Sequence, residues 1–133
     1  MHAKYVIAVT FAALCFSACG NPAQEQFVRD TDAICKRVNR AFSKQLDSPE
    51  TLATMHSVAR QAQTELETIE APAESARQFA QYLKVNQERI DLLGAALKHP
   101  VPHLSDDPRM RRAEALRDQS GSLAQALGFA HCS

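Results

Sequence analysis

Apolar residues recur along most of this chain at alternating intervals of three and four, the period of a helix with one buried face. Four such stripes can be read. They are Phe27, Thr31, Ile34, Val38, Ala41 and Phe42; Leu52, Met55, Ala59, Ala62, Leu66 and Ile69; Ala76, Phe79, Leu83, Asn86, Ile90, Leu93 and Leu97; and Ala113, Leu116, Ser120, Leu123 and Leu127. No useful length of chain alternates with period two, so the pattern predicts four helices and no sheet.

Turn residues set the predicted boundaries. The first helix should span residues 23 to about 46, and Ser48 with Pro49 gives the second a cap and a first-turn proline. Ala71-Pro72 separates the second helix from the third, which should run to Lys98. After the proline-rich connection 99–103, Asp107-Pro108 should start the fourth helix and Gly128 should end it.

Mostly short links between amphipathic helices favour an antiparallel up-down four-helix bundle. Asn86 is the polar member of the third stripe, and we interpret it as a residue that fixes helix register rather than as a binding residue.

The first 18 residues have the pattern of an export signal: Lys4, an apolar run from Tyr5 to Phe16, then Ser17 and Ala18. The run is shorter than the ~17 residues that span a bilayer, so we expect it to be removed rather than kept as an anchor.

Phe16-Ser17-Ala18-Cys19 resembles the lipobox of bacterial lipoproteins, although Leu is usual in place of Phe16. The resemblance implies that Cys19 is acylated and becomes the mature N-terminus. Ordinary signal-peptidase cleavage is the alternative, and it would place Phe16 where a small residue is needed. Gly20 is not the Asp typical of inner-membrane retention, which implies the outer membrane in a cell with two. We therefore expect a signal peptide at 1–18, a tether at 19–24 and a helical domain at 25–133.

Two of the four cysteines lie in the signal and lipobox, which leaves Cys35 and Cys132. Thiols of an exported protein usually pair, and their spacing is not that of a redox or zinc motif. An antiparallel bundle brings the end of the fourth helix beside the first half of the first, where these cysteines would meet. We predict a structural disulfide.

Lys and Arg number 15, as do Asp and Glu, and a chain without basic excess is not typical of nucleic-acid binding. The sequence lacks the motifs for covalent haem, zinc proteases, P-loops and serine hydrolases. No Glu stands three residues before a His, as di-iron bundles require. We expect no enzyme and no resident cofactor.

Two weaker groups of candidates remain. Met55, His56, His99, His103 and Met110 should share the membrane-distal end, where thioether and imidazole suit copper or haem iron. Met55 is more simply explained as core packing. Lys36, Arg37, Arg40 and Lys44 form a basic stripe on the first helix, which is either a partner surface or a solvated flank.

Three segments resemble the small exported helical lipoproteins of bacteria: Ala33-Ile34-Cys35, Ile69-Glu70-Ala71-Pro72-Ala73-Glu74 and Leu127-Gly128-Phe129-Ala130-His131-Cys132. The resemblance implies a disulfide-closed bundle and transfers no activity. We expect a non-enzymatic, lipid-anchored envelope protein that acts as a structural or binding module for a protein or another envelope component. A metal- or haem-binding bundle of the periplasm is the alternative.

Overall fold

A computed structural model describes residues 20–43 and 51–132, so the signal, Cys19 and the predicted cap at Ser48 lie outside the described residues. The elements are α1 (Pro22–Ser43), α2 (Thr51–Leu66), α3 (Ala73–Lys98), the short 3-10 turn η1 (Leu104–Asp106) and α4 (Pro108–Ala126). This part of the chain contains no strand, and the all-α prediction is confirmed. None of its helices is both long and apolar enough to cross a membrane.

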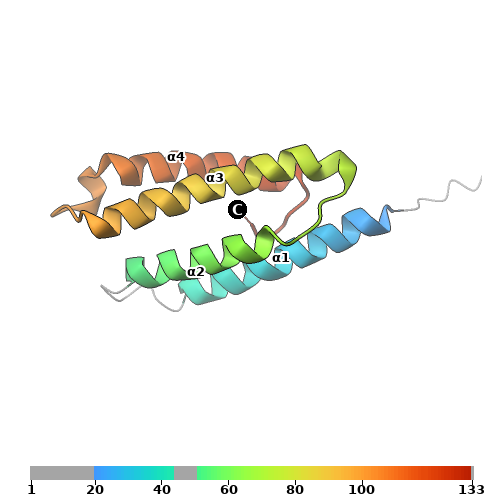
Figure 1. Cartoon of the computed structure of the whole chain (residues 1–133), viewed down its shortest axis with the longest axis horizontal. Coiled ribbons are helices and arrows are strands. Elements are labelled where there is room, and N and C mark those ends of the chain that lie inside the picture. The colour runs from blue at the N-terminus through green and yellow to red at the C-terminus, as the bar shows by residue number, and fades with distance from the viewer. Residues whose placement is uncertain (1–19, 44–50, 133) are drawn as a thin grey trace, which may run out of the picture.

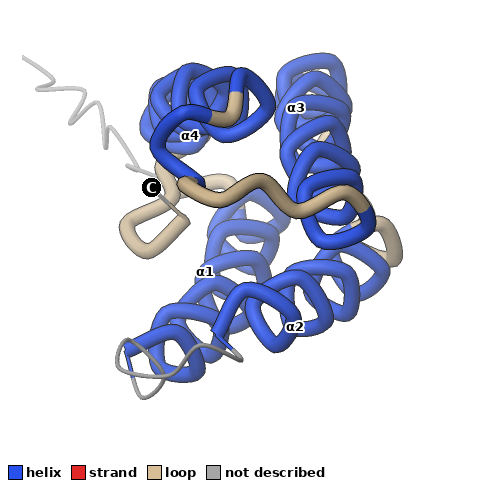
Figure 2. The backbone as a smooth tube through the Cα atoms, turned by 90° about the vertical axis from the view of Figure 1, so that its left-hand side faces the viewer, coloured by secondary structure: helices blue, strands red, loops and turns tan. Residues whose placement is uncertain are grey.

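Successive helices run in opposite directions (Figure 1), and the end view places them at four corners in chain order (Figure 2). Three sides of the bundle are closed, because α1 packs on α2, α2 on α3 and α3 on α4. On the fourth side, no described Cα of α1 lies within 8 Å of one in α4. The predicted up-down antiparallel bundle is confirmed, but its α1–α4 side is open along the helices.

Two helices start with the same pair of residue types, a short polar cap followed by proline. Asp107 Oδ1 accepts the backbone N–H of Arg109 at 2.8 Å, with Pro108 in the first turn of α4 as predicted. Asn21 Oδ1 accepts the N–H of Ala23 at 3.2 Å, so α1 already begins at Pro22. The predicted tether is therefore too long, because Gln24 and the two residues before it are helical.

The C-terminal end of α4 turns sharply into the last described segment of the chain. Gly128 has a φ of 84°, in the left-handed region that glycine adopts without strain. The N–H of Phe129 donates to the Ala124 carbonyl at 2.9 Å, and that of Gly128 donates to Gln125 at 3.0 Å. This pair of bonds is the Schellman motif, and it sends the chain back toward α1.

A clip, which we define as the C-terminal segment 129–132 and its anchors on α1, joins the end of α4 to α1 across the open side. Cys35 of α1 and Cys132 form a disulfide with an S–S distance of 2.05 Å and a Cα–Cα distance of 5.0 Å, as predicted. The Asp32 carboxylate accepts the backbone N–H groups of Ala130 and His131 at 3.0 and 2.9 Å. The α1–α4 side is thus held by covalent and polar links rather than by helix packing.

Aromatic rings fill the end of the bundle at which α1 begins. Phe27 meets Phe79 edge to face with centroids 4.9 Å apart, and Phe129 of the clip lies 5.3 Å from Phe27. Tyr82 also joins this cluster and is 2% exposed. Burying these rings accounts for much of the apolar surface that this end removes from water.

The predicted stripe of the third helix is partly wrong. Ala76 is exposed, whereas Tyr82 and Val85, which lie outside the stripe, are buried. The reason is that α3 packs on both α2 and α4, so its buried face is wider than one row of residues at intervals of three and four.

The turn from α3 to α4 is held by Arg109. Its guanidinium binds the Asp107 carboxylate at 2.7 to 3.0 Å and donates to the carbonyls of Ala95 and His99 at 2.8 and 2.6 Å. The His99 carbonyl lies at the C-terminal end of α3, where carbonyls lack partners within the helix. The Ala95 carbonyl also accepts the backbone N–H of His99 at 3.1 Å, so Arg109 is its second donor. The hydrogen bond from Arg109 holds the pKa of Asp107 below its usual value.

Replacing both bridged cysteines, as in Cys35→Ser with Cys132→Ser, should lower the free energy of unfolding by about 4–5 kcal/mol, because the unfolded chain regains the freedom of a long loop. The sequence separation of the bridged pair is 97 residues. Urea denaturation of the oxidised, reduced and double-serine proteins measures this. The prediction is wrong if reduction leaves the urea midpoint of the wild-type protein unchanged.

Asp107→Asn should lower the thermal midpoint at neutral pH, because the amide keeps the helix cap and loses the charge that binds Arg109. A carboxylate with a lowered pKa stabilises the fold above its ordinary pKa, and this contribution disappears as the pH falls through the folded-state value. The difference in midpoint between the variant and the wild type should therefore shrink below about pH 4. Asp118→Asn, at an exposed position of the same helix, is the control. A difference that does not depend on pH would contradict the assignment.

Candidate functional site: a cavity between the helices

A cavity of about 440 Å³ lies between the four helices, next to the aromatic end. Each helix contributes one stripe to its wall. The stripes are Ile34, Cys35, Val38, Asn39 and Phe42 on α1; Met55, Ala59, Ala62, Gln63 and Leu66 on α2; Tyr82, Asn86, Arg89, Ile90 and Leu93 on α3; and Met110, Ala113, Glu114, Arg117 and Ser120 on α4. His131 and Cys132 of the clip complete the wall. The volume of the cavity falls within the range of small-molecule sites in proteins.

The cavity exists because small side chains occupy core positions where larger ones would close a bundle. Ala59 and Ala62 stand on the α2 stripe, and Ala113 and Ser120 stand on the α4 stripe. Packed interiors normally leave few voids larger than a water molecule. Here α1 and α4 do not approach within packing distance along their lengths, so no facing side chain fills the space above the alanines.

The mouth of the cavity lies on the open α1–α4 side. Among its lining residues, Asn39 on α1 and Glu114 and Arg117 on α4 are exposed, whereas Ala62 and Ile90 on the opposite helices are buried. The clip bounds one end of this mouth, where Asn39 Nδ2 donates to the His131 carbonyl at 2.8 Å. A ligand can therefore reach the interior from this side of the bundle.

A polar corner, formed by Tyr82, Asn86 and Arg89 of α3 with Ser120 of α4, interrupts the apolar wall. Ser120 is 1% exposed, and its hydroxyl donates to Asn86 Oδ1 at 2.7 Å. Arg89 Nη1 reaches the same oxygen at 3.4 Å. The Tyr82 hydroxyl lies 3.8 Å from the sulfur of Cys35, and because that sulfur is in a disulfide, only the tyrosine can donate.

Burial shifts the acid–base properties of two groups in this corner. Burial raises the pKa of the Tyr82 hydroxyl, and the hydrogen bond from Asn86 opposes the rise only in part. Burial also lowers the pKa of Arg89. The positive charge of Arg117 adds to this effect, and the negative charge of Glu114 opposes it. At neutral pH Tyr82 is thus a neutral donor, and Arg89 remains a cation because an arginine pKa starts far above 7.

The charge of Arg89 has no counter-ion within the described residues. Its neighbour Glu114 forms an ion pair with Arg117 at 3.0 Å on the surface of α4. The long hydrogen bond to Asn86 satisfies one of the five N–H donors of the guanidinium. A half-buried cation with so few partners carries an electrostatic cost in the free protein.

Gln63 adds an open acceptor to the cavity wall. Its amide donates to the Leu83 carbonyl at 3.1 Å and to Glu67 at 2.9 Å, which links α2 to α3. Its Oε1 has no hydrogen-bond partner among the described groups, although the residue is only 5% exposed. A bound water or a ligand donor would satisfy this oxygen.

The structure separates the predicted metal candidates. Met55 and Met110 both line the cavity, so the expectation that they share one end of the bundle holds. His56 packs against α3, where a Cβ on Gly94 would lie 2.8 Å from its Nε2, and His99 and His103 are exposed in the connection before η1. The described residues contain no group of three or more His, Cys, Asp or Glu that could hold a metal ion.

The predicted basic stripe is exposed on α1, with Lys44 outside the described residues. Arg37 is bound by Glu65 of α2 in an ion pair. Arg40 Nε reaches the Lys36 carbonyl at 3.4 Å. Of the three described cations of the stripe, one is therefore in an ion pair and a second bonds to the backbone of its own helix.

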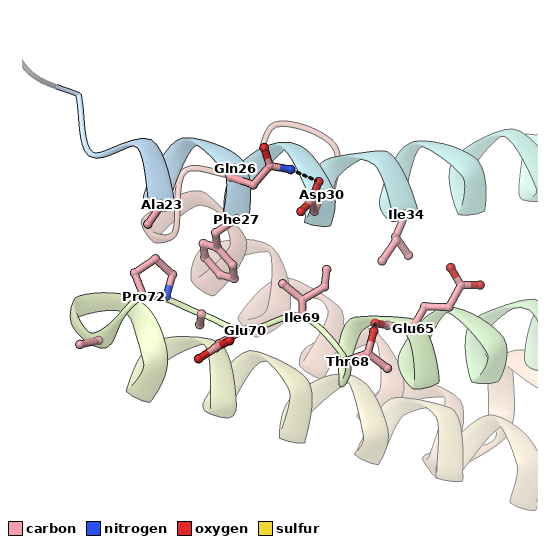
Figure 3. Close-up of a pocket in the computed structure, with 12 residues that line it drawn as sticks. Ala23, Gln26, Phe27, Asp30, Ile34, Glu65, Thr68, Ile69, Glu70 and Pro72 are labelled. Atoms are coloured by element: carbon pink, nitrogen blue, oxygen red, sulfur yellow. Dashed lines mark hydrogen bonds between the residues drawn. The ribbon is translucent and has the colours of Figure 1, made fainter.

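A second depression, of about 800 Å³, is an open groove between α1 and the α2–α3 junction (Figure 3). Asp30, Glu65 and Glu70 rim it, and Ile34 and Ile69 line its floor. Two of these carboxylates already have partners, since Asp30 accepts from Gln26 at 2.6 Å and Glu65 binds Arg37 of α1. The interhelical cavity is the stronger site, because all four helices line it and its wall holds a cation without an ion-pair partner among the described residues.

Comparison of the chain with protein-family models, curated proteins and solved structures gave no match. The site is therefore interpreted from its own geometry.

Ser120→Ala should destabilise the protein by about 1 kcal/mol, because it removes the buried hydrogen bond to Asn86. Ser122→Ala is the matched control on the same helix, since Ser122 is exposed and bonds only to its own helix. Its effect should stay within about 0.5 kcal/mol. Urea denaturation of both variants measures the difference, and equal stabilities would show that the corner contributes nothing to the fold.

Proposed function

We propose that this chain is a non-enzymatic, lipid-anchored binding protein of the bacterial cell envelope that holds a small, largely apolar ligand between its helices. One observation carries the proposal: the four helices leave a cavity between them whose wall is largely apolar and contains a buried polar corner. Ligand sites in proteins typically have this composition. The proposal keeps the expected binding module and makes its partner a small envelope component.

Export and lipidation are supported by two features. The apolar run before Cys19 has the order of a lipoprotein signal. The Cys35–Cys132 bridge fits an oxidising compartment, where disulfides form and persist. With α1 starting at Pro22, a lipid on Cys19 would hold the aromatic end of the bundle close to the membrane.

A binding role suits the chemistry of the cavity better than catalysis does. Tyr82 keeps its proton and Arg89 its charge at neutral pH, so neither supplies a base. Glu114 lies at the mouth in an ion pair with Arg117. The two lining methionines fit a flexible apolar wall, since Met adapts its shape to irregular contacts.

The other expected roles have less support. Docking of a protein through the basic stripe would have to displace Glu65 from Arg37. A metal or haem in the cavity would find the thioethers of Met55 and Met110, while the three predicted histidines are not among the lining residues.

Filling the cavity tests the proposal. Ala59→Phe places a ring in the space between the helices, whereas Ala53→Phe adds the same ring at an exposed position of α2. The neutral fluorescent probe N-phenyl-1-naphthylamine should bind the wild type and Ala53→Phe saturably, and should bind Ala59→Phe at least about tenfold more weakly.

Circular dichroism of both variants checks that they fold. The proposal fails if the wild type shows no saturable binding, or if folded Ala59→Phe binds the probe as tightly as the wild type does.

A further inference from the structure

We propose that the ligand of this cavity is an amphipathic monocarboxylate, with its carboxylate on Arg89 and its apolar body among the side chains of the distal wall. The inference rests on the proposed binding function and adds the chemical class of the ligand.

The anionic head is argued from the unpaired charge of Arg89. The side chain is half-buried in the cavity wall, and the carboxylates of the described chain lie outside ion-pair distance of it. A desolvated cation without a counter-ion is unfavourable, and a bound anion removes that cost. A cationic ligand would add to it, and a neutral one would leave it in place.

The geometry of the corner suits a carboxylate. A guanidinium presents paired N–H donors that match the two oxygens of a carboxylate. Tyr82 lies two turns before Arg89 on the same helix and lines the same cavity. Its hydroxyl now donates only toward a disulfide sulfur at 3.8 Å, a weak acceptor, so it is free to turn to a stronger one.

A single negative charge matches the site better than two. Arg117, the other cation of the wall, is exposed and already paired with Glu114. The polar corner therefore offers one positive charge that has no ion-pair partner among the described residues.

The apolar body is argued from the remainder of the wall. From the polar corner toward the α3–α4 connection, the lining side chains are apolar and come from all four helices; they are Val38, Phe42, Met55, Leu93 and Met110. These side chains are half-buried, so a ligand lying among them would cover apolar surface that the free protein leaves partly in water.

The test compares three ligands that share one alkyl chain and differ in the head: decanoate, decanol and decyltrimethylammonium. Displacement of N-phenyl-1-naphthylamine from the wild-type protein is measured for each at pH 7.5. The two ionic ligands are kept below their micelle concentrations and decanol below its solubility limit. Decanoate should displace the probe at about tenfold or more lower concentration than decanol, the gain expected of a charge-assisted hydrogen bond. The cation should be the weakest.

Variants then assign the effect to the named residues. Arg89→Met keeps an unbranched aliphatic stem, removes the guanidinium and should abolish the preference for decanoate over decanol. Arg77→Met, at an exposed position of the same helix, should preserve it. Tyr82→Phe should reduce the preference a few-fold. The thermal melt of each variant checks folding independently of binding.

The outcomes separate the two proposals. Saturable binding of decanol and decanoate with equal strength, or a preference that survives in Arg89→Met, overturns the carboxylate inference and leaves the binding function standing. Failure of the wild type to bind the probe or any of the three ligands overturns the binding function itself.

Discussion

The covalent bond between Cys35 and Cys132 is the constraint on which the rest of this structure depends. It ties the end of the chain to the first helix across the one side of the bundle where the helices do not pack. Four-helix bundles of this size ordinarily close that side with interdigitated side chains. Here the clip does so at one end, with Asp32 holding the backbone N–H groups of Ala130 and His131. The distal half of the same side is consequently free to form a mouth.

This division gives the bundle two unlike halves. Near the start of α1, Phe27, Phe79 and Phe129 build a dense core. Farther along, Ala59, Ala62 and Ala113 leave space, and Arg89 stands in the wall without a counter-ion. A charged side chain in a cavity wall without a counter-ion lowers the stability of the fold. Positions where a residue works against stability in this way tend to be functional. The densely packed half thus adjoins the half that contains the cavity.

Much of the fold was readable from the sequence, because its signals are local. Asp107-Pro108 and Gly128 predicted the two ends of α4, and both are where they were expected. The Asn21-Pro22 pair carries the same signal and would have corrected the start of α1.

The candidate site was far less predictable, since its residues acquire meaning only through their neighbours. In the sequence, Arg89 is indistinguishable from a solvated charge on a helix surface. Only the packing of α4 against α3 makes it part of the cavity wall. Asn86 looked like a register residue, and its bond to Ser120 on α4 is compatible with that role. The partners of Asp32 are backbone N–H groups 98 and 99 positions away, and backbone groups leave no pattern in a sequence.

The most direct test of this account is mass spectrometry of the mature protein purified from the cell envelope and digested with trypsin without reduction. The account predicts that peptides 30–36 and 118–133 appear as one disulfide-linked species, which reduction separates. It also predicts an N-terminal peptide that begins at an acylated Cys19. Recovery of the two peptides as free thiols would contradict the central claim, because the covalent link between the end of the chain and α1 would then be missing.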